Sequence, residues 1–192
     1  MNRSLDLFTL IYETVIDPVA GGRAVIALRP PTPVRWMLLV AAILVSVVLM
    51  YSLPVMTGQV ADMPAPWAFA GAQLALNVLV VALVAYVGRM FNGTGNFDDA
   101  LLLMAWLQSV TVALFIVQLF VLIVVPALNF PITMISVAIS VWMMTGFICA
   151  LHGFQSRLMV LVASISVFTM TVFALSVLLL MLGFDLSGVS DV

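Results

Sequence analysis

The sequence predicts an all-α, polytopic membrane protein, with five transmembrane helices preceded by a short cytoplasmic amphipathic helix. Of its 192 residues, 65% are hydrophobic and 7% are charged, whereas a soluble domain has about 45–50% apolar and about 25% charged residues. The mean hydropathy is +1.31. The apolar residues also form five long stretches, and a membrane-spanning helix needs about 20 such residues. Five spans with short connections use nearly the whole chain, so we expect no separate globular domain.

Turn-forming residues separate the five apolar stretches. Proline, glycine and asparagine interrupt helices and favour turns, and such residues occur in every break. Pro54 should bend or end the first span, because proline removes a backbone donor inside a helix. We place the spans at residues 36–56, 67–87, 100–125, 131–151 and 158–184.

The residues before the first span form a predicted amphipathic helix that Ser4 can cap. Asp6, Glu13 and Asp17 argue against a cleaved signal peptide, which needs an uninterrupted apolar core, so we expect this segment in the mature protein. Asp17 followed by Pro18 is typical of a second helical start. The apolar face comprises Phe8, Ile11, Tyr12, Val15 and Val19. Such a helix can lie on the membrane or dock beneath the bundle, and the pattern permits both.

The arginines predict the topology, because arginine near the ends of spans is retained on the cytoplasmic side. With the spans placed as above, all six arginines fall on one side of the membrane: Arg3, Arg23, Arg29, Arg35, Arg89 and Arg157. The N-terminus is therefore expected in the cytoplasm and the C-terminus outside. This divides the chain into a cytoplasmic segment at 1–35, a transmembrane domain at 36–184 and an extracytoplasmic tail at 185–192.

The predicted spans hold few polar groups. No Asp, Glu, Lys or Arg lies well inside a span, although proton relays and ion-coupled carriers usually need such groups at bilayer depth. Four amide side chains remain in the second and third spans, namely Gln73, Asn77, Gln108 and Gln118. They are predicted to form hydrogen bonds that pack the helices. In the alternative reading they line the path of a small carrier or channel for a neutral or apolar molecule.

Several function classes are disfavoured by the same inventory. The chain has six arginines, no lysine and a net charge of −2, which does not suit a nucleic-acid surface. An enzyme would need a nucleophile or general base near the interface, and only His152 and the pair Asp98 and Asp99 are available. His152 is better explained as a residue that interacts with carbonyls at a helix end. We therefore expect a protein that is not an enzyme and has no catalytic residue, cofactor or metal site.

The loop at 91–100 contains two glycines followed by Asn96 and two aspartates. Asn96 can cap the third span, with Asp98 and Asp99 favourably placed in the first turn of the helix. Two glycines without a lysine do not make a phosphate-binding loop, so nucleotide binding is not expected here.

Three motifs resemble the Yip family, the Ypt- and Rab-interacting membrane proteins whose domain also occurs in bacteria. They are LIYETVIDP at 10–18 before the first span, GTGNFDDAL at 93–101 entering the third, and WMMTG at 142–146 with LHGFQS at 151–156 closing the fourth. Their order and spacing resemble those of the family over nearly the whole chain. The chain departs from the family in lacking a proline early in the third span.

The resemblance implies a five-span membrane protein without catalysis that acts through contacts with proteins or lipids. We therefore expect an inner-membrane scaffold or accessory subunit, with membrane lipids and a membrane protein as partners. The use of arginine without lysine, together with abundant alanine, favours a bacterial source. The candidate contact surface consists of Asp17, Pro18, Gly93, Gly95, Phe97, Asp98, Asp99 and His152.

Overall fold

The computed structural model describes residues 7–58 and 63–181, and these residues form helices and turns without a strand. The contacts divide the chain into two units, Met1–Gln155 and Ser156–Val192, and each unit is described by itself. Among the described residues, five helices are long and apolar enough to cross a membrane. The predicted all-α polytopic membrane fold is confirmed. The predicted tail at 185–192, Ser4 as a cap and Arg3 lie outside the described residues.

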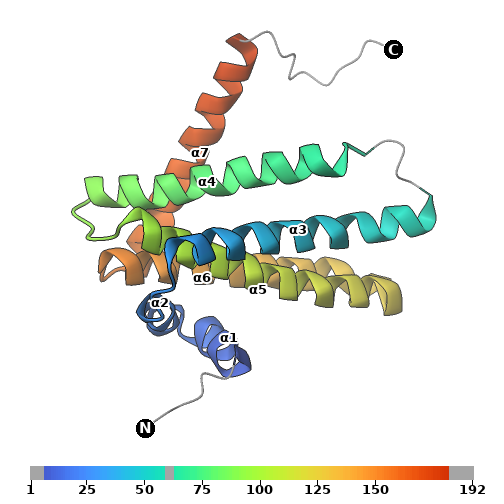
Figure 1. Cartoon of the computed structure of the whole chain (residues 1–192), viewed down its shortest axis with the longest axis horizontal. Helices are drawn as coiled ribbons and strands as arrows, with labels where there is room; N and C mark the ends of the chain where they lie inside the picture. Colours follow the sequence, from blue (N-terminus) through green and yellow to red (C-terminus); the bar gives the residue numbers. More distant parts are fainter. Residues whose placement is uncertain (1–6, 59–62, 182–192) are drawn as a thin grey trace. The chain divides into compact units, whose positions relative to one another are not determined.

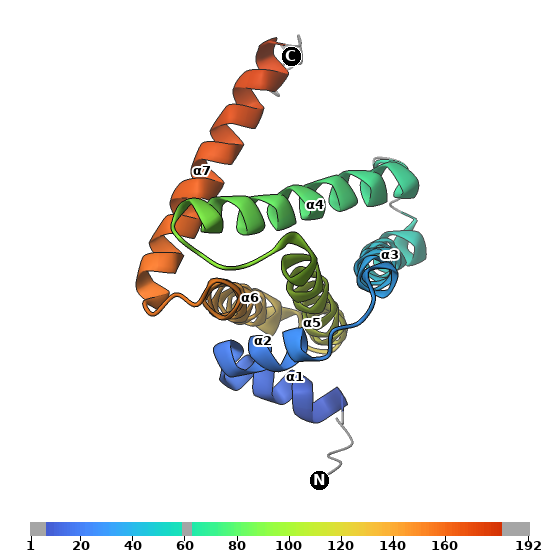
Figure 2. The same ribbon diagram turned by 60° about the vertical axis from the view of Figure 1, so that its left-hand side comes forward.

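Four of these helices belong to the first unit, and their bounds are α3 (Thr32–Thr57), α4 (Pro66–Met90), α5 (Phe97–Val124) and α6 (Asn129–His152). A short 3₁₀ turn, η1 (Pro126–Leu128), joins α5 to α6. Helix α5 contacts α3, α4 and α6 and is the centre of the bundle. Figures 1 and 2 show α3, α5 and α6 lying side by side, with α4 beside them. All residues at 100–106 of α5 are buried, so this part of the helix is enclosed on every side.

Each of the five helices begins one to four residues before its predicted span. Helix α3 begins at Thr32, where Pro33 occupies a position in the first turn that needs no backbone donor. Pro54 does not stop this helix at once, because α3 continues to Thr57. The helix then ends at Gly58 with φ of +72°, a left-handed conformation that glycine adopts without strain.

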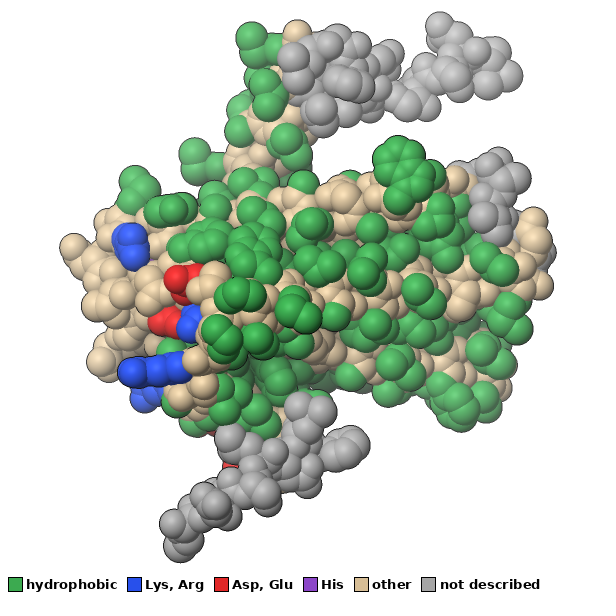
Figure 3. Space-filling view, in the orientation of Figure 1, with side chains coloured by type: hydrophobic (Ala, Val, Ile, Leu, Met, Phe, Trp, Pro, Cys, Tyr) green, Lys and Arg blue, Asp and Glu red, His purple; other side chains and the backbone are tan. Residues whose placement is uncertain are grey.

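One end of the bundle carries the charged side chains. We call it the arginine end; it is formed by the first turns of α3 and α5 and the last turns of α4 and α6. Arg35 lies in the first turn of α3 and Arg89 in the last turn of α4. Figure 3 shows blue and red side chains gathered at this end, while apolar side chains cover the length of the helices on the visible face. For the residues that the structure describes, this distribution is that of a bundle with an apolar belt and one charged rim.

The N-terminal segment forms two helices, α1 (Leu7–Ile16) and α2 (Pro18–Ala27), which we call the α1–α2 hairpin. As the sequence predicts, Asp17 caps the second helix, and its carboxylate accepts from the amides of Val19 and Ala20 at 3.2 Å. Helix α2 packs on α6 and α5, and α1 packs on α2. Both helices run transverse to the bundle (Figures 1 and 2). The hairpin therefore docks against the side of the bundle.

Small residues allow this close contact. A Cβ atom added to Gly146 of α6 would lie 2.6 Å from Pro18, and one added to Gly22 of α2 would lie 3.0 Å from the side chains of Ala150 and Phe147. Gly146 and Ala150 lie one turn apart on α6, as do Pro18 and Gly22 on α2. Backbones with such small residues can approach closely.

Helix α1 packs part of its predicted apolar face on the bundle, because Ile11 and Val15 contact the core. Leu10 and Thr14 are the buried residues, whereas Tyr12 is 66% exposed. The hydroxyl of Thr14 donates to the carbonyl of Leu10 at 2.9 Å and accepts from the indole of Trp106 at 3.4 Å. A second indole, that of Trp142, donates to the carbonyl of Val15 at 3.2 Å. The hydrogen bonds to two tryptophans favour this orientation over one with Tyr12 inside.

The second unit contains α7 (Arg157–Met181), the fifth helix long enough to span. The hydroxyl of Ser156 accepts from the amide of Met159 at 3.3 Å and caps the first turn. Within the helix, hydroxyls such as those of Ser166 and Thr169 donate to the carbonyl four residues earlier. These polar groups are satisfied inside the helix, as they must be in a lipid environment.

Replacing Gly146 with leucine should release the hairpin from the bundle, because the new side chain occupies the position of Pro18. We expect amide hydrogen exchange in α1 and α2 to accelerate in Gly146→Leu, while the amides of α5 remain protected. Ala138 of α6 is exposed, so Ala138→Leu is the matched control and should leave the exchange of the hairpin unchanged. Unchanged exchange in Gly146→Leu would contradict this docking.

Candidate functional site

His152 is the central residue of the arginine end. It is the last residue of α6, and only 3% of it is exposed. Its Nδ1 accepts from the amide of Gly95 at 3.1 Å, and its Nε2 lies 2.9 Å from the carbonyl oxygen of Val84. Because an amide can only donate and a carbonyl can only accept, the imidazole carries its proton on Nε2 and is neutral. The side chain therefore joins the end of α6 to α4 and to the loop after α4, and does not bond the carbonyls of its own helix.

Three glycines enclose this imidazole. A Cβ atom at Gly88, Gly93 or Gly95 would lie less than 3.0 Å from the ring of His152, a separation that real Cβ atoms do not show. Gly88 belongs to the last turn of α4, and the other two belong to the loop. Phe154 stacks on the ring with its centroid 5.3 Å away. The glycines are thus explained by close approach to a buried side chain.

Backbone contacts fix the loop between α4 and α5 against the helices. The amide of Gly93 donates to the carbonyl of Gly88 at 2.9 Å, and Nε of Arg89 donates to the carbonyl of Gly95 at 2.8 Å. Asn92 has φ of +62°, in the left-handed region that asparagine tolerates better than most residues. The loop is therefore held at Gly95 by both His152 and Arg89.

The start of α5 is fixed by a cap and an ion pair. Asn96 accepts from the amide of Asp99 at 2.8 Å, as the sequence predicts for a cap, and its side-chain amide donates to Asp99 at 2.7 Å. Asp99 also pairs with Arg35 of α3 at 2.9 Å. Nε of Arg35 donates to the carbonyl of Pro30 at 2.9 Å. Arg35 is 9% exposed, so this ion pair is largely shielded from water, and charge-assisted bonds are among the stronger ones.

The predicted contact residues divide into buried and exposed groups. Pro18, Gly95 and His152 are buried in contacts within the chain, whereas Asp17 and Asp98 are exposed. Gly93, Phe97 and Asp99 are partly buried; the ring of Phe97 lies 6.4 Å from that of Trp36. The exposed residues of the loop, which we call the loop surface, are Met90, Phe91, Asn92, Thr94, Asn96 and Asp98.

The sequence analysis did not predict the role of two residues of this site. Gly88 closes one side of the glycine enclosure, and Arg35 holds Asp99. A glycine in the last turn of a helix otherwise rich in alanine and valine was a signal for Gly88, because glycine weakens a helix unless packing requires it. No local pattern pairs Arg35 with a residue 64 positions away.

The four amide side chains within the spans are all partly buried. Oε1 of Gln73 accepts from the hydroxyl of Ser46 on α3 at 3.1 Å, which links two helices. Nδ2 of Asn77 donates to the carbonyl of Gln73 in its own helix at 2.9 Å. Gln108 and Gln118 lie ten positions apart on α5, about 15 Å along the helix axis.

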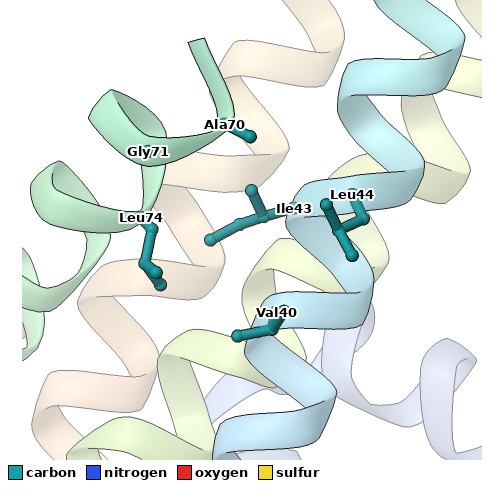
Figure 4. A pocket seen from close by; sticks show the side chains of 6 residues that line it. All are labelled: Val40, Ile43, Leu44, Ala70, Gly71 and Leu74. Atoms are coloured by element: carbon teal, nitrogen blue, oxygen red, sulfur yellow. The ribbon is translucent and has the colours of Figure 1, made fainter. Parts of the chain in front are cut away.

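A groove of about 120 Å³ lies between α3 and α4 and is lined only by apolar residues. Figure 4 shows Val40, Ile43 and Leu44 of α3 opposite Ala70, Gly71 and Leu74 of α4. None of the four amide residues lines this groove. The lining of the groove is therefore as apolar as the acyl chains of the lipid that surround a membrane helix.

These features define a polytopic α-helical membrane protein whose charged end is organised around a buried histidine and a glycine-rich loop. The sequence model of the Yip1 domain matches residues 12–178. This match covers most of the hairpin, the loop and the end of α6, and the chain belongs to the Yip1 domain family. Searches of curated proteins and of solved structures gave no match.

Substituting Gly88 tests the glycine enclosure. We expect Gly88→Ala to lower the free energy of unfolding by about 1–3 kcal/mol, because the new methyl group overlaps the imidazole of His152. Gly71 is a matched control in the same helix, since a Cβ atom there meets nothing within 4 Å. Gly71→Ala should be neutral or stabilising by up to about 1 kcal/mol. Unfolding in mild detergent measures both, and equal effects would contradict the enclosure.

Neighbouring aspartates test the ion pair. Asp99→Asn removes the charge that faces Arg35 and should destabilise the protein by about 1–3 kcal/mol. Asp98 accepts only a longer, exposed bond from Thr32 at 3.3 Å, so Asp98→Asn should change stability by less than about 0.5 kcal/mol. Thermal unfolding of the two variants side by side gives the comparison. A larger loss of stability in Asp98→Asn than in Asp99→Asn would contradict the assignment of Asp99 as the partner of Arg35.

Proposed function

We propose that this Yip1 domain protein is a scaffold or accessory subunit without catalytic activity, which acts through protein and lipid contacts. The arginine end would face the cytoplasm of a bacterial cell, with the protein in the inner membrane, because arginine-rich ends are retained on that side. The loop surface would be the site at which a membrane-protein partner binds.

The observation that carries this proposal is the fixed loop between α4 and α5. Its inner side is held by His152 and Arg89, while Phe91 on its outer side is 62% exposed and Met90 is 81% exposed. Fixing a surface before binding lowers the entropy lost on association. Aromatic residues are enriched among the side chains that contribute most to binding. An exposed phenylalanine on a fixed loop therefore suits a protein contact.

The state of the ionisable groups at this end also supports a role without catalysis. Both ring nitrogens of His152 are engaged with backbone groups of the chain. Asp99 is engaged with Arg35 and Asn96. A general base needs a free acceptor within reach of its substrate, and these two residues use their polar atoms to hold the loop and the helix end.

The test is co-purification from native membranes with a matched pair of variants. The tagged protein should be isolated in native nanodiscs, and its associated proteins quantified by mass spectrometry. We expect a stoichiometric partner with the wild type and a loss of at least about fivefold with Phe91→Ala, which corresponds to about 1 kcal/mol. Phe130 of α6 is 72% exposed and lies at the opposite end of the bundle, so Phe130→Ala should retain the partner.

Three results would count against the proposal. These are a wild-type protein that purifies alone, a partner retained equally by Phe91→Ala, and a partner lost equally from both variants. A protein that purifies alone with an enriched small molecule would favour the carrier. Because neither phenylalanine is buried, unfolding should not complicate the comparison.

A further inference from the structure

The surface of α1 has three sides with three different chemistries. Leu10 and Thr14 are buried against the bundle. Tyr12 and Ile16, one turn apart, are 66% and 58% exposed and form a second side. Glu13 is exposed about 100° around the helix from Tyr12 and gives α1 an acidic third side. A helix in water needs only two sides, one apolar and one polar.

A helix in the plane of a membrane surface meets three environments. One side touches the protein, one faces the acyl chains and one faces water and headgroups. The buried side of α1 touches the protein, the apolar side corresponds to the acyl chains, and the acidic side corresponds to water and headgroups. The lipid of one leaflet is therefore the occupant that explains the exposed apolar side.

The depth of the hairpin agrees with this placement. Trp142, which donates to Val15, lies ten residues from the end of α6 at His152, or about 15 Å along the axis. Gly146, which contacts Pro18, lies about 9 Å from that end. The headgroup region on each side of a bilayer is about 5–8 Å thick. Both depths exceed the thickness of the headgroup region, so helices attached there lie below the headgroups, within about 10 Å of the boundary with the acyl chains.

The hairpin also makes the first unit asymmetric across the membrane. Helices α1 and α2 have ten residues each, so each is about 15 Å long and about 10 Å across. Both run transverse to the spanning helices (Figure 2), on the side of the bundle near the arginine end. At the opposite end, the described residues form only the short η1 turn and the flanks of the connection between α3 and α4. Among the described residues of the first unit, the cross-section is therefore larger on the arginine side.

We propose that the α1–α2 hairpin is a one-leaflet membrane insert, with Tyr12 and Ile16 among the acyl chains, and that it makes the protein favour membrane that is convex on the arginine side. A helix that inserts in one leaflet occupies packing space there, and its binding depends on curvature. This inference requires lipid only and does not depend on the protein partner proposed above.

Depth measurement tests the insertion. Spin labels are placed one at a time at positions 12, 13 and 16 of a Cys149→Ala protein, reconstituted alone in phosphatidylcholine and phosphatidylglycerol vesicles. We expect labels at 12 and 16 to collide mainly with oxygen, which concentrates in acyl chains, and the label at 13 to collide mainly with a water-soluble nickel chelate. Equal exposure of all three labels to the chelate would overturn the insertion, and so would protection of 12 and 16 from both reagents, which would show a second chain over them.

Orientation in vesicles of different size tests the curvature preference. The protein, with an N-terminal tag, is reconstituted in vesicles of about 40 nm and about 400 nm diameter, and an external protease reports the fraction with the tag outside. We expect that fraction to be higher in the small vesicles, because their outer leaflet is convex. The bias should be lost in Tyr12→Ser/Ile16→Ser and retained in Glu13→Gln.

Both results are needed for the proposal to stand. A wild-type fraction that is independent of diameter would overturn it, as would a bias that the double serine variant retains. Hydrogen exchange at the amide of Thr14 should be unchanged in the double variant, which would show that α1 remains docked on the bundle. Loss of the bias together with lost protection at Thr14 would mean that docking, and not the lipid side, controls orientation, and would overturn the role of Tyr12 and Ile16.

Discussion

The arrangement of the arginine end depends on the imidazole of His152, which occupies a space left by three glycines. The ring receives one hydrogen bond from a loop amide and gives one to a helix carbonyl, so a single side chain aligns α4, α6 and the loop before α5. In an apolar environment, association between helices gains little from the hydrophobic effect. The free energy of association then comes from close packing and from hydrogen bonds between the helices. A buried, doubly bonded ring meets both requirements.

The other polar contacts follow the same logic. Arg35 and Asp99 join α3 to α5, and the indoles of Trp106 and Trp142 join α1 to the bundle. Each contact links two elements that are far apart in the sequence, and each lies toward the arginine end. The opposite half of the bundle is held mainly by apolar packing, with two polar contacts: Ser46 donates to Gln73, and the hydroxyl of Tyr51 donates to the carbonyl of Pro64. Specific alignment is thus concentrated where the loop surface and the hairpin meet the membrane boundary.

The sequence predicted the five spans, the cap at Asn96 and the second helical start at Asp17, because each has a local signature in composition or spacing. It could not predict which apolar face meets a helix and which meets lipid, since both environments are apolar. For that reason the apolar pattern of α1 did not separate Ile11 and Val15, which contact the core, from Tyr12, which is exposed. The glycine enclosure and the ion pair could not be predicted either, because they join residues 57 and 64 positions apart and leave no periodic pattern.

The docking of α1 on α6 has a consequence for biosynthesis. Val15 is bonded to a residue 127 positions later in the chain, and domains are generally made from the N-terminus onward. The hairpin is therefore translated long before its binding site is complete, and its contacts with α6 can form only after the fourth spanning helix has been made. Docking of the hairpin on α6 is a late event that marks a nearly complete bundle, and a chain interrupted before Trp142 would lack the bond that holds Val15.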